Sequence, residues 1–90
     1  MRRAKVDRNH ALIVAALRGV GCSVQSLAMV GKGCPDALVG RDGRNYLLEI
    51  KADEKSRLRA VQADWCASWR GSVATVRTVE EALAVVLDEL

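Results

Sequence analysis

Two carboxylates and a lysine near the middle of the chain have the types and spacing that metal-dependent cleavage of a phosphodiester requires. Asp36 follows Pro35 at a chain reversal, and Glu49 and Lys51 stand two residues apart at the end of a later apolar run. Hard divalent cations prefer oxygen ligands, and Mg²⁺ is usually held by one or two carboxylates, water and substrate phosphate. We therefore predict that Asp36 and Glu49 are catalytic residues that bind Mg²⁺ or Mn²⁺, with the backbone carbonyl of Ile50 as a further candidate ligand.

Lys51 and Gln62 complete the candidate catalytic set. The Lys51 ammonium would stand beside a metal-bound water, where it could hold the scissile phosphate or orient the attacking water. The metal would lower the pKa of that water and stabilise the leaving alkoxide. Gln62 falls on a later helix, where its amide could hydrogen-bond the metal water, Glu49 or a phosphate. The competing interpretation is an exposed helical Gln62, a solvated Glu49–Lys51 pair on an edge strand, and Asp36 as a turn residue.

The histidine and cysteine content excludes several other chemistries. No Ser/His/Asp triad can be assembled from one histidine, His10, and no glycine-rich phosphate loop is present. The three cysteines include no C-x-x-C pair, so neither a disulfide framework nor a zinc site is expected. Reduced thiols predict a cytoplasmic protein, located in the host cell cytoplasm if it is viral. The longest apolar run, Ala11–Leu17, is too short to cross a bilayer, so no membrane partner is expected.

Positive charge is concentrated in the first part of the chain. The net charge is +3, but all 14 Lys and Arg precede Thr78, and the residues from Thr78 onward hold four acids and no base. A basic body suits a polyanionic partner such as nucleic acid, although a solvated surface is the alternative on charge alone. The residues predicted to bind DNA are Arg2, Arg3, Lys32, Lys55, Arg57 and Arg59.

Apolar periodicity and turn residues predict an α/β protein with the element order α-β-β-β-α-β-α. Ninety residues suffice for a single small domain, residues 1–90. The predicted helices cover residues 7–18, 58–69 and the stretch from 78 onward, and the predicted strands cover residues 22–30, 36–39, 44–51 and 72–77. Asp42-Gly43 between two apolar runs is a strong hairpin signal, and Thr78 with Glu81 predicts a capping box.

The predicted hairpin brings the two carboxylates together. Twelve residues separate Asp36 from Glu49, which is enough for a strand, a tight turn and a return strand. Antiparallel pairing places such residues alongside each other. Because residues two apart in a strand share a face, Glu49 and Lys51 point away from the core that Leu48 and Ile50 enter.

Two of the predicted helices are expected to bury apolar surface. The first helix is apolar almost all round between Ala11 and Leu17, which predicts heavy burial. In the second, one apolar stripe at spacings of three and four is formed by Leu58, Val61, Trp65 and Trp69. The first strand is interrupted at Gln25-Ser26, so a bulge or bend is expected there.

Taken together, these residues resemble the PD-(D/E)XK nuclease superfamily, and more closely its VRR-NUC family, the virus-type replication and repair nucleases. The resemblance covers nearly the whole chain and is carried by Gly33-x-Pro35-Asp36, Leu48-Glu49-Ile50-Lys51, Gln62-x-x-Trp65, Trp69-x-Gly71 and Thr78-x-Glu80-Glu81. It implies a restriction-endonuclease-like domain, a central mixed sheet flanked by helices. It also implies that Asp36 and Glu49 are metal ligands, that Lys51 is the catalytic lysine, and that Gln62 belongs to the active site.

A domain of this size resembles the minimal, stand-alone phage form of the family. That form implies a DNA-repair endonuclease of the Holliday-junction type, a homodimer whose two symmetric sites cut matching strands of a four-way junction. Candidate dimer interfaces are Trp65 with Trp69, the last helix, or a strand edge. Many superfamily members carry an acidic residue on the first helix facing the site. This sequence departs from that pattern, because only Asp7, Asn9 and His10 are near that position.

Two alternatives to junction cleavage stay open at the level of sequence. The first is a nuclease that acts on flaps, nicks or single strands. The second is a non-catalytic nucleic-acid-binding or assembly module, which would explain the basic body without using Glu49 and Lys51.

Overall fold

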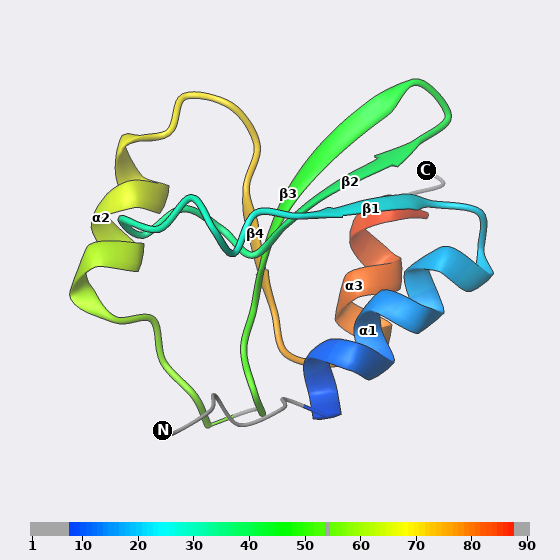
Figure 1. Ribbon diagram of the computed structural model, residues 1–90, viewed down its shortest axis with the longest axis horizontal. Coiled ribbons are helices and arrows are strands. Elements are labelled where there is room, and N and C mark those ends of the chain that lie inside the picture. Colours follow the sequence, from blue (N-terminus) through cyan, green and yellow to red (C-terminus); the bar gives the residue numbers. More distant parts are fainter. Residues whose placement is uncertain (1–7, 54, 88–90) are drawn as a thin grey trace.

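The helices and strands follow one another in the order that the sequence predicts. The computed structural model describes residues 8–53 and 55–87. The elements in these ranges are shown in Figure 1 and are α1 (Arg8–Gly19), β1 (Ser23–Ser26), β2 (Ala37–Arg41), β3 (Arg44–Ile50), α2 (Ala60–Ser68), β4 (Ala74–Val76) and α3 (Val79–Val86). The predicted α/β class and its α-β-β-β-α-β-α order are therefore confirmed.

The strands form one mixed sheet in the order β1-β2-β3-β4. The β1–β2 and β2–β3 pairs are antiparallel and the β3–β4 pair is parallel, so β3 is flanked on both sides. The interpretation of Glu49 and Lys51 as a pair on an edge strand is therefore wrong. Asp42 and Gly43 join β2 to β3 with φ angles of 52° and 77°, and positive φ at both central residues is what a type I′ hairpin turn needs.

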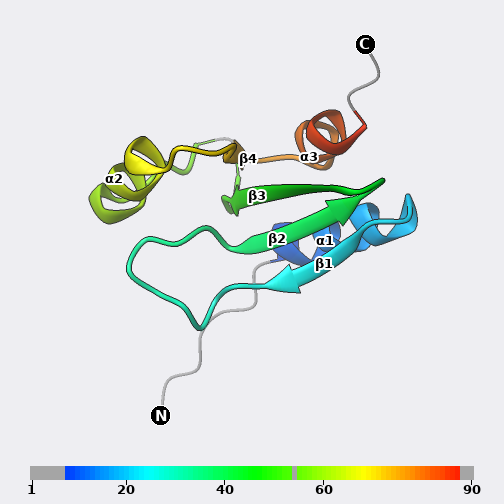
Figure 2. The ribbon, with the colours of Figure 1, turned by 90° about the horizontal axis from the view of Figure 1, so that it is seen from above.

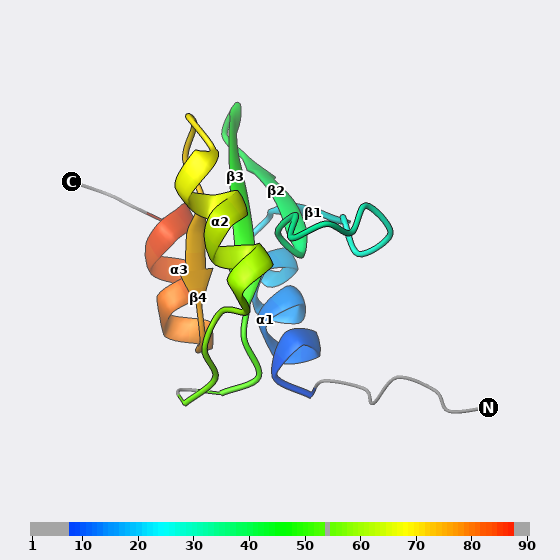
Figure 3. The same cartoon turned by 90° about the vertical axis from the view of Figure 1, so that its left-hand side faces the viewer.

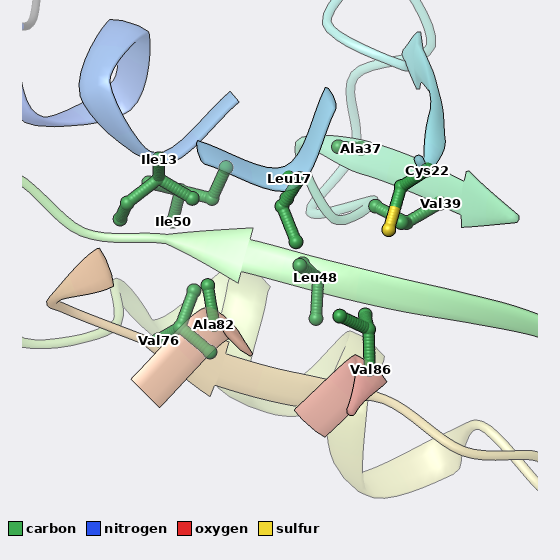
Figure 4. Close-up of a cluster of buried hydrophobic side chains, with 10 residues drawn as sticks. All are labelled: Ile13, Leu17, Cys22, Ala37, Val39, Leu48, Ile50, Val76, Ala82 and Val86. Carbon is green, nitrogen blue, oxygen red and sulfur yellow. The ribbon is translucent and has the colours of Figure 1, made fainter. Parts of the chain in front are cut away.

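One face of the sheet packs against α1 and α3 and forms the core. The buried apolar side chains that meet there, drawn in Figure 4, are Ile13, Leu17, Cys22, Ala37, Val39, Leu48, Ile50, Val76, Ala82 and Val86. Alternation along β3 sends Leu48 and Ile50 into this core and Glu49 to the opposite face, as predicted.

The opposite side of the sheet carries α2, away from α1 and α3 (Figures 1 and 3). The loop between β1 and β2 extends on the same side as α2 (Figure 2). Gly33 in this loop has φ +83°, and a Cβ there would come within 2.4 Å of the Val61 carbonyl oxygen. Both the backbone conformation and the close contact therefore require glycine, and this contact holds the start of α2 against the loop that leads to Asp36.

The first helix is less buried than predicted. Within α1 the buried residues are Ile13 and Leu17, whereas Leu12 is 54 % exposed and Ala11 and Ala15 are also exposed. The prediction of heavy burial was wrong because the sheet and α3 cover one side of the helix, while the residues on its other side that the structure describes, such as Leu12, remain exposed.

The apolar stripe predicted for residues 58–69 is also wrong. α2 begins at Ala60, so Leu58 precedes it. Val61 and Trp69 are 44 % and 47 % exposed, and the buried residue of α2 is Gln62. A polar side chain takes the inward position because the sheet presents a carboxylate to it, as described below.

Several element ends differ from the prediction. The first strand stops at Ser26 rather than continuing to residue 30. The Leu27 N–H still donates to the Asp36 carbonyl at 2.8 Å, and the chain then turns, with the Val30 N–H donating to the Leu27 carbonyl at 3.0 Å. Met29 on this turn is 98 % exposed. The second strand runs to Arg41 instead of residue 39, and the fourth strand keeps only three of its six predicted residues.

Thr78 caps the last helix, as predicted. Its Oγ1 accepts from the Glu81 N–H at 3.0 Å. The Glu81 carboxylate accepts in return from the N–H of Arg77 at 2.7 Å, one residue before the position that a capping box uses. Across the described residues, none of the helices has the length and apolar character needed to span a membrane.

Candidate active site

Asp36 and Glu49 face each other at the end of the β2–β3 hairpin. Ala37 pairs with Leu48, and continuing this register by one residue places Asp36 opposite Glu49. The Asp36 N–H donates to the Leu48 carbonyl at 3.0 Å. The Ile50 N–H donates to Asp36 Oδ2 at 2.7 Å, so the carboxylate supplies the acceptor just before β2 begins. This bond holds the Asp36 side chain beside Glu49.

The Glu49 carboxylate is buried and has an oxygen without a donor. Glu49 is 1 % exposed, and its Oε1 has no hydrogen-bond partner among the described residues. Burial, followed by the charge of Asp36, raises the pKa of Glu49 from 4.5 to about 7, although Lys51 acts in the opposite direction. An unsatisfied buried acceptor costs about 1–3 kcal/mol, which a cation bound at Oε1 would remove.

Gln62 connects Glu49 to Lys51. Its Nε2 donates to Glu49 Oε2 at 2.8 Å, and its Oε1 accepts from Lys51 Nζ at 3.1 Å and from the Arg59 N–H at 2.8 Å. Lys51 Nζ also lies 3.7 Å from Glu49 Oε2. Gln62 is thus a buried residue of the site rather than an exposed helical glutamine.

The bond from Arg59 shows why Gln62 is held so firmly. Arg59 is the N-cap of α2 and Gln62 is the third residue of the helix. A glutamine at this position can reach back to the cap N–H, as in a capping box. The sequence carries this signal weakly, because Arg is not a usual N-cap residue, and the prediction for Gln62 did not use it.

The donor set fits a hard divalent cation. Within the part of the chain that the structure describes, no group of three or more His, Cys, Asp or Glu side chains gathers to hold a metal. The protein would therefore contribute two carboxylates, which suits Mg²⁺ or Mn²⁺ because these ions keep several waters and take substrate oxygens as further ligands. The Ile50 side chain is in the core and its N–H binds Asp36, and the role of its carbonyl as a ligand stays a prediction.

A solved protein has the same arrangement of helices and strands. A structure described as a VRR_NUC domain matches 92 % of this chain and 95 % of its own, with a TM-score of 0.75 and 22 % sequence identity. The chain has the VRR_NUC fold. At this level of identity the likeness concerns the fold alone. No protein-family model and no curated protein matches the sequence.

The first helix of this VRR_NUC-like fold supports the site through the backbone. Asn9 Nδ2 donates to the Lys51 carbonyl at 2.7 Å and to the Arg77 carbonyl at 2.9 Å, and thereby ties α1 to the chain just beyond β3 and β4. Sequence reasoning missed this contact because its partners lie 42 and 68 residues away. His10 lines a different cavity, between α1 and β1. Asp7 lies outside the described residues.

Four of the six basic residues predicted to bind DNA lie on the connections from β1 to β2 and from β3 to α2. Lys32 is exposed in the β1–β2 loop, with φ 57°. Lys55, Arg57 and Arg59 are exposed in the segment between β3 and α2. Arg2 and Arg3 lie outside the described residues. Phosphate binding by these basic residues stays a prediction.

Proposed function

We propose that the protein is a divalent-metal-dependent endonuclease that hydrolyses phosphodiesters in DNA. The observation that carries the proposal is the buried, donor-free Oε1 of Glu49 beside the Asp36 carboxylate. Two carboxylates held together in a dry environment repel each other, and a shared cation offsets this repulsion. The likeness to a VRR_NUC domain supports a nuclease.

Each residue of the site has a role in this proposal. Asp36 and Glu49 would hold Mg²⁺ or Mn²⁺, which when bound lowers the pKa of a coordinated water and neutralises charge on the phosphoryl oxygens. Lys51 offers an ammonium next to Glu49, where it holds the scissile phosphate or orients the attacking water. Gln62 fixes Glu49 and Lys51 relative to each other through its two ends. No covalent nucleophile is required.

The proposed substrate is branched DNA, with the four-way junction first. The excess of Lys and Arg over Asp and Glu, 14 against 11, favours a polyanionic partner. A homodimer would supply two sites related by a two-fold axis, which suits paired cuts on matching strands. Flaps, nicked duplexes and single strands are alternative substrates for the same chemistry.

A cleavage assay tests the proposal. Purified protein is incubated with end-labelled junction, flap, nicked duplex and single strand, with Mn²⁺ or with EDTA, and its mass is measured by sedimentation. We expect cutting with Mn²⁺ alone, fastest on the junction, by a dimer. Binding without Mn²⁺-dependent cutting would instead identify a non-catalytic binding or assembly module.

The Lys51→Ala variant separates catalysis from binding. Because the lysine is proposed to act on the reacting phosphate, we expect cleavage to fall by about 10²- to 10³-fold, in the range for removal of one transition-state contact. Affinity for the junction should change little, because many Lys and Arg share the phosphate contacts. Cleavage at the normal rate by this variant would refute the role of Lys51.

A further inference from the structure

An apolar groove of 410 Å³ lies on the face of the sheet that carries Asp36 and Glu49. Its floor is formed by Leu38 of β2 and Leu47 of β3, which pair with each other in the sheet. The other residues that line it come from the β1–β2 loop, β3, α2 and the segment after α2, and they are Leu27, Cys34, Asn45, Trp65, Trp69 and Ser72.

The groove floor and the carboxylates lie on the same face of the sheet. Leu38 is two residues from Asp36 and Leu47 is two residues from Glu49, so the floor begins roughly 7 Å along each strand from the proposed metal ligands. Cys34, which lines the groove, is two residues before Asp36 in the chain.

α2 also joins the two regions. Gln62 and Trp65 are three residues apart in α2, a spacing that places side chains along one side of a helix. Trp69 is the C-cap residue just after α2, and its N–H donates to the Trp65 carbonyl at 3.1 Å. The helix side that begins with the glutamine bound to Glu49 thus leads to the two indoles of the groove. One extended ligand can reach both ends.

The two indoles form a stack before any ligand binds. The ring centroids of Trp65 and Trp69 are 4.6 Å apart and their planes differ by 16°. A Cβ at Gly71 would lie 2.9 Å from the indole nitrogen of Trp69, so the glycine leaves room for this ring. Trp69 nevertheless remains 47 % exposed. A fixed, half-exposed aromatic surface is suited to stacking of a flat ligand, because little side-chain entropy is lost on binding.

We infer that this groove is a subsite for an unpaired nucleobase of the strand whose phosphate lies at Asp36 and Glu49, an inference that rests on the proposed function. Bases stack on aromatic side chains without regard to sequence. Asn45 and Ser72 line the groove and supply hydrogen-bonding groups for a base edge. Its volume lies in the range of small-molecule sites, about 300–1,000 Å³.

Charge around the groove favours a nucleotide over a second copy of this chain. Arg70 is exposed and stands next in sequence to the lining residue Trp69. A cation at this place complements the phosphates on either side of a bound base, whereas two copies docked through the groove would bring their Arg70 side chains together. The subsite predicts a preference for DNA with unpaired nucleotides next to the cut, as at a flap or a junction centre.

Intrinsic fluorescence offers a direct test, because the chain has two tryptophans and both line the groove. The protein is titrated in EDTA with pentathymidylate and with an abasic pentamer of the same charge. Tryptophan is excited selectively, and its emission is measured at each oligomer concentration. We expect the base-bearing oligomer to quench the emission and to bind about ten-fold or more tightly than the abasic one. Equal affinity without quenching would overturn the inference.

Variants locate the effect. Trp69→Ala should abolish most of the ten-fold preference for pentathymidylate, measured by anisotropy of labelled oligomers, while Trp69→Phe should retain most of it. Leu12→Ala, which removes an exposed apolar side chain from α1, serves as the matched control and should leave both affinities unchanged. A preference unaffected by Trp69→Ala, or a dimer in sedimentation that this variant dissociates, would overturn the inference.

The readout also separates this inference from the proposed function. Base-dependent quenching with no Mn²⁺-dependent cutting would leave the subsite standing and refute the nuclease. Mn²⁺-dependent cutting with no base preference would refute the subsite and leave the nuclease standing.

Discussion

The side-chain amide of Gln62 donates to the buried Glu49 carboxylate at 2.8 Å. The oxygen of the same amide accepts a hydrogen bond from the Lys51 ammonium at 3.1 Å. A single helical residue therefore holds both the carboxylate of Glu49 and the ammonium of Lys51 in place. Groups that orient metal ligands and catalytic residues are commonly worth 10- to 100-fold in metal affinity or activity. Gln62 should therefore matter for catalysis although it need not touch the reacting phosphate.

Replacement of Gln62 by alanine tests this relationship. Gln62→Ala should lower the rate of Mn²⁺-dependent cleavage by about 10- to 100-fold and weaken Mn²⁺ binding, because Glu49 and Lys51 lose their common partner. The measurement is cleavage rate as a function of Mn²⁺ concentration. Gln25→Ala is the matched control, because Gln25 is exposed and bonds only the neighbouring Ser26 carbonyl in the described structure. Equal rates for the two variants would contradict the assignment.

The raised pKa of Glu49 predicts how the metal-free protein responds to pH. Since this pKa is about 7 in the folded protein against an ordinary 4.5, the folded state retains a proton that the unfolded state has lost between these two values. The Glu49 carboxyl therefore favours folding below pH 4.5, and this contribution is lost as pH rises through 7, by up to about 3 kcal/mol. Urea unfolding in EDTA at pH 5 and pH 8 measures the change.

Glu49→Gln should remove that pH dependence, because an amide does not titrate. The control is Asp64→Asn, which replaces an exposed carboxylate on α2. Metal binding should show the opposite trend in the unmodified protein, with Mn²⁺ affinity rising as pH increases through 7, because the cation competes with the proton for Glu49. Identical pH profiles for Glu49→Gln and the unmodified protein would refute the assigned pKa.

Because the β1–β2 loop contacts α2 at Gly33, alanine substitutions at Gly33 and Gly31 should differ in how much they lower the free energy of unfolding. Gly33→Ala should destabilise the fold by about 3 kcal/mol or more, since it combines a positive φ with a Cβ placed 2.4 Å from the Val61 carbonyl. Gly31→Ala has a similar positive φ of 72° but open space around the Cβ, and should cost only about 1–2 kcal/mol. Urea unfolding of both variants measures the difference, and equal losses would contradict the close contact.

The hydrogen bonds that Asn9 of α1 makes to the backbone beyond β3 and β4 should contribute to stability. Asn9→Ala removes the donor to the carbonyls of Lys51 and Arg77, and should cost about 1–3 kcal/mol because both acceptors are partly buried. Asn45→Ala, at an exposed position of β3, is the control for unfolding and should cost less than Asn9→Ala. An unchanged free energy of unfolding in Asn9→Ala would show that these two hydrogen bonds contribute nothing to stability.

The sequence predicted the hairpin and its consequences because these depend on local rules. Asp42-Gly43 specifies the turn, the turn specifies the register, and the register places Asp36 opposite Glu49. The position of Leu48 and Ile50 in the core follows from the same alternation. Thus the two proposed metal ligands could be brought together from sequence without any knowledge of the rest of the fold.

The features that sequence did not predict depend on contacts between distant elements. Gln62 points inward, and Val61 and Trp69 stay partly exposed, because Gln62 hydrogen-bonds the Glu49 carboxylate and the Lys51 ammonium. The periodicity of a helix carries no information about such partners on other elements. The burial of α1 was overestimated because apolar composition does not say how many sides of a helix have neighbours. The hydrogen bonds from Asn9 to the carbonyls of Lys51 and Arg77 join residues too far apart in sequence for any local pattern to predict.

The central claim is that Asp36 and Glu49 share one divalent cation. The most direct measurement is the anomalous difference map of a crystal soaked in Mn²⁺ at pH 8, above the pKa of Glu49. The account predicts a peak between the two carboxylates, with Glu49 Oε1 as a ligand, and loss of that peak in Glu49→Gln. A map with no peak there, or with Mn²⁺ bound elsewhere at saturating concentration, would contradict it.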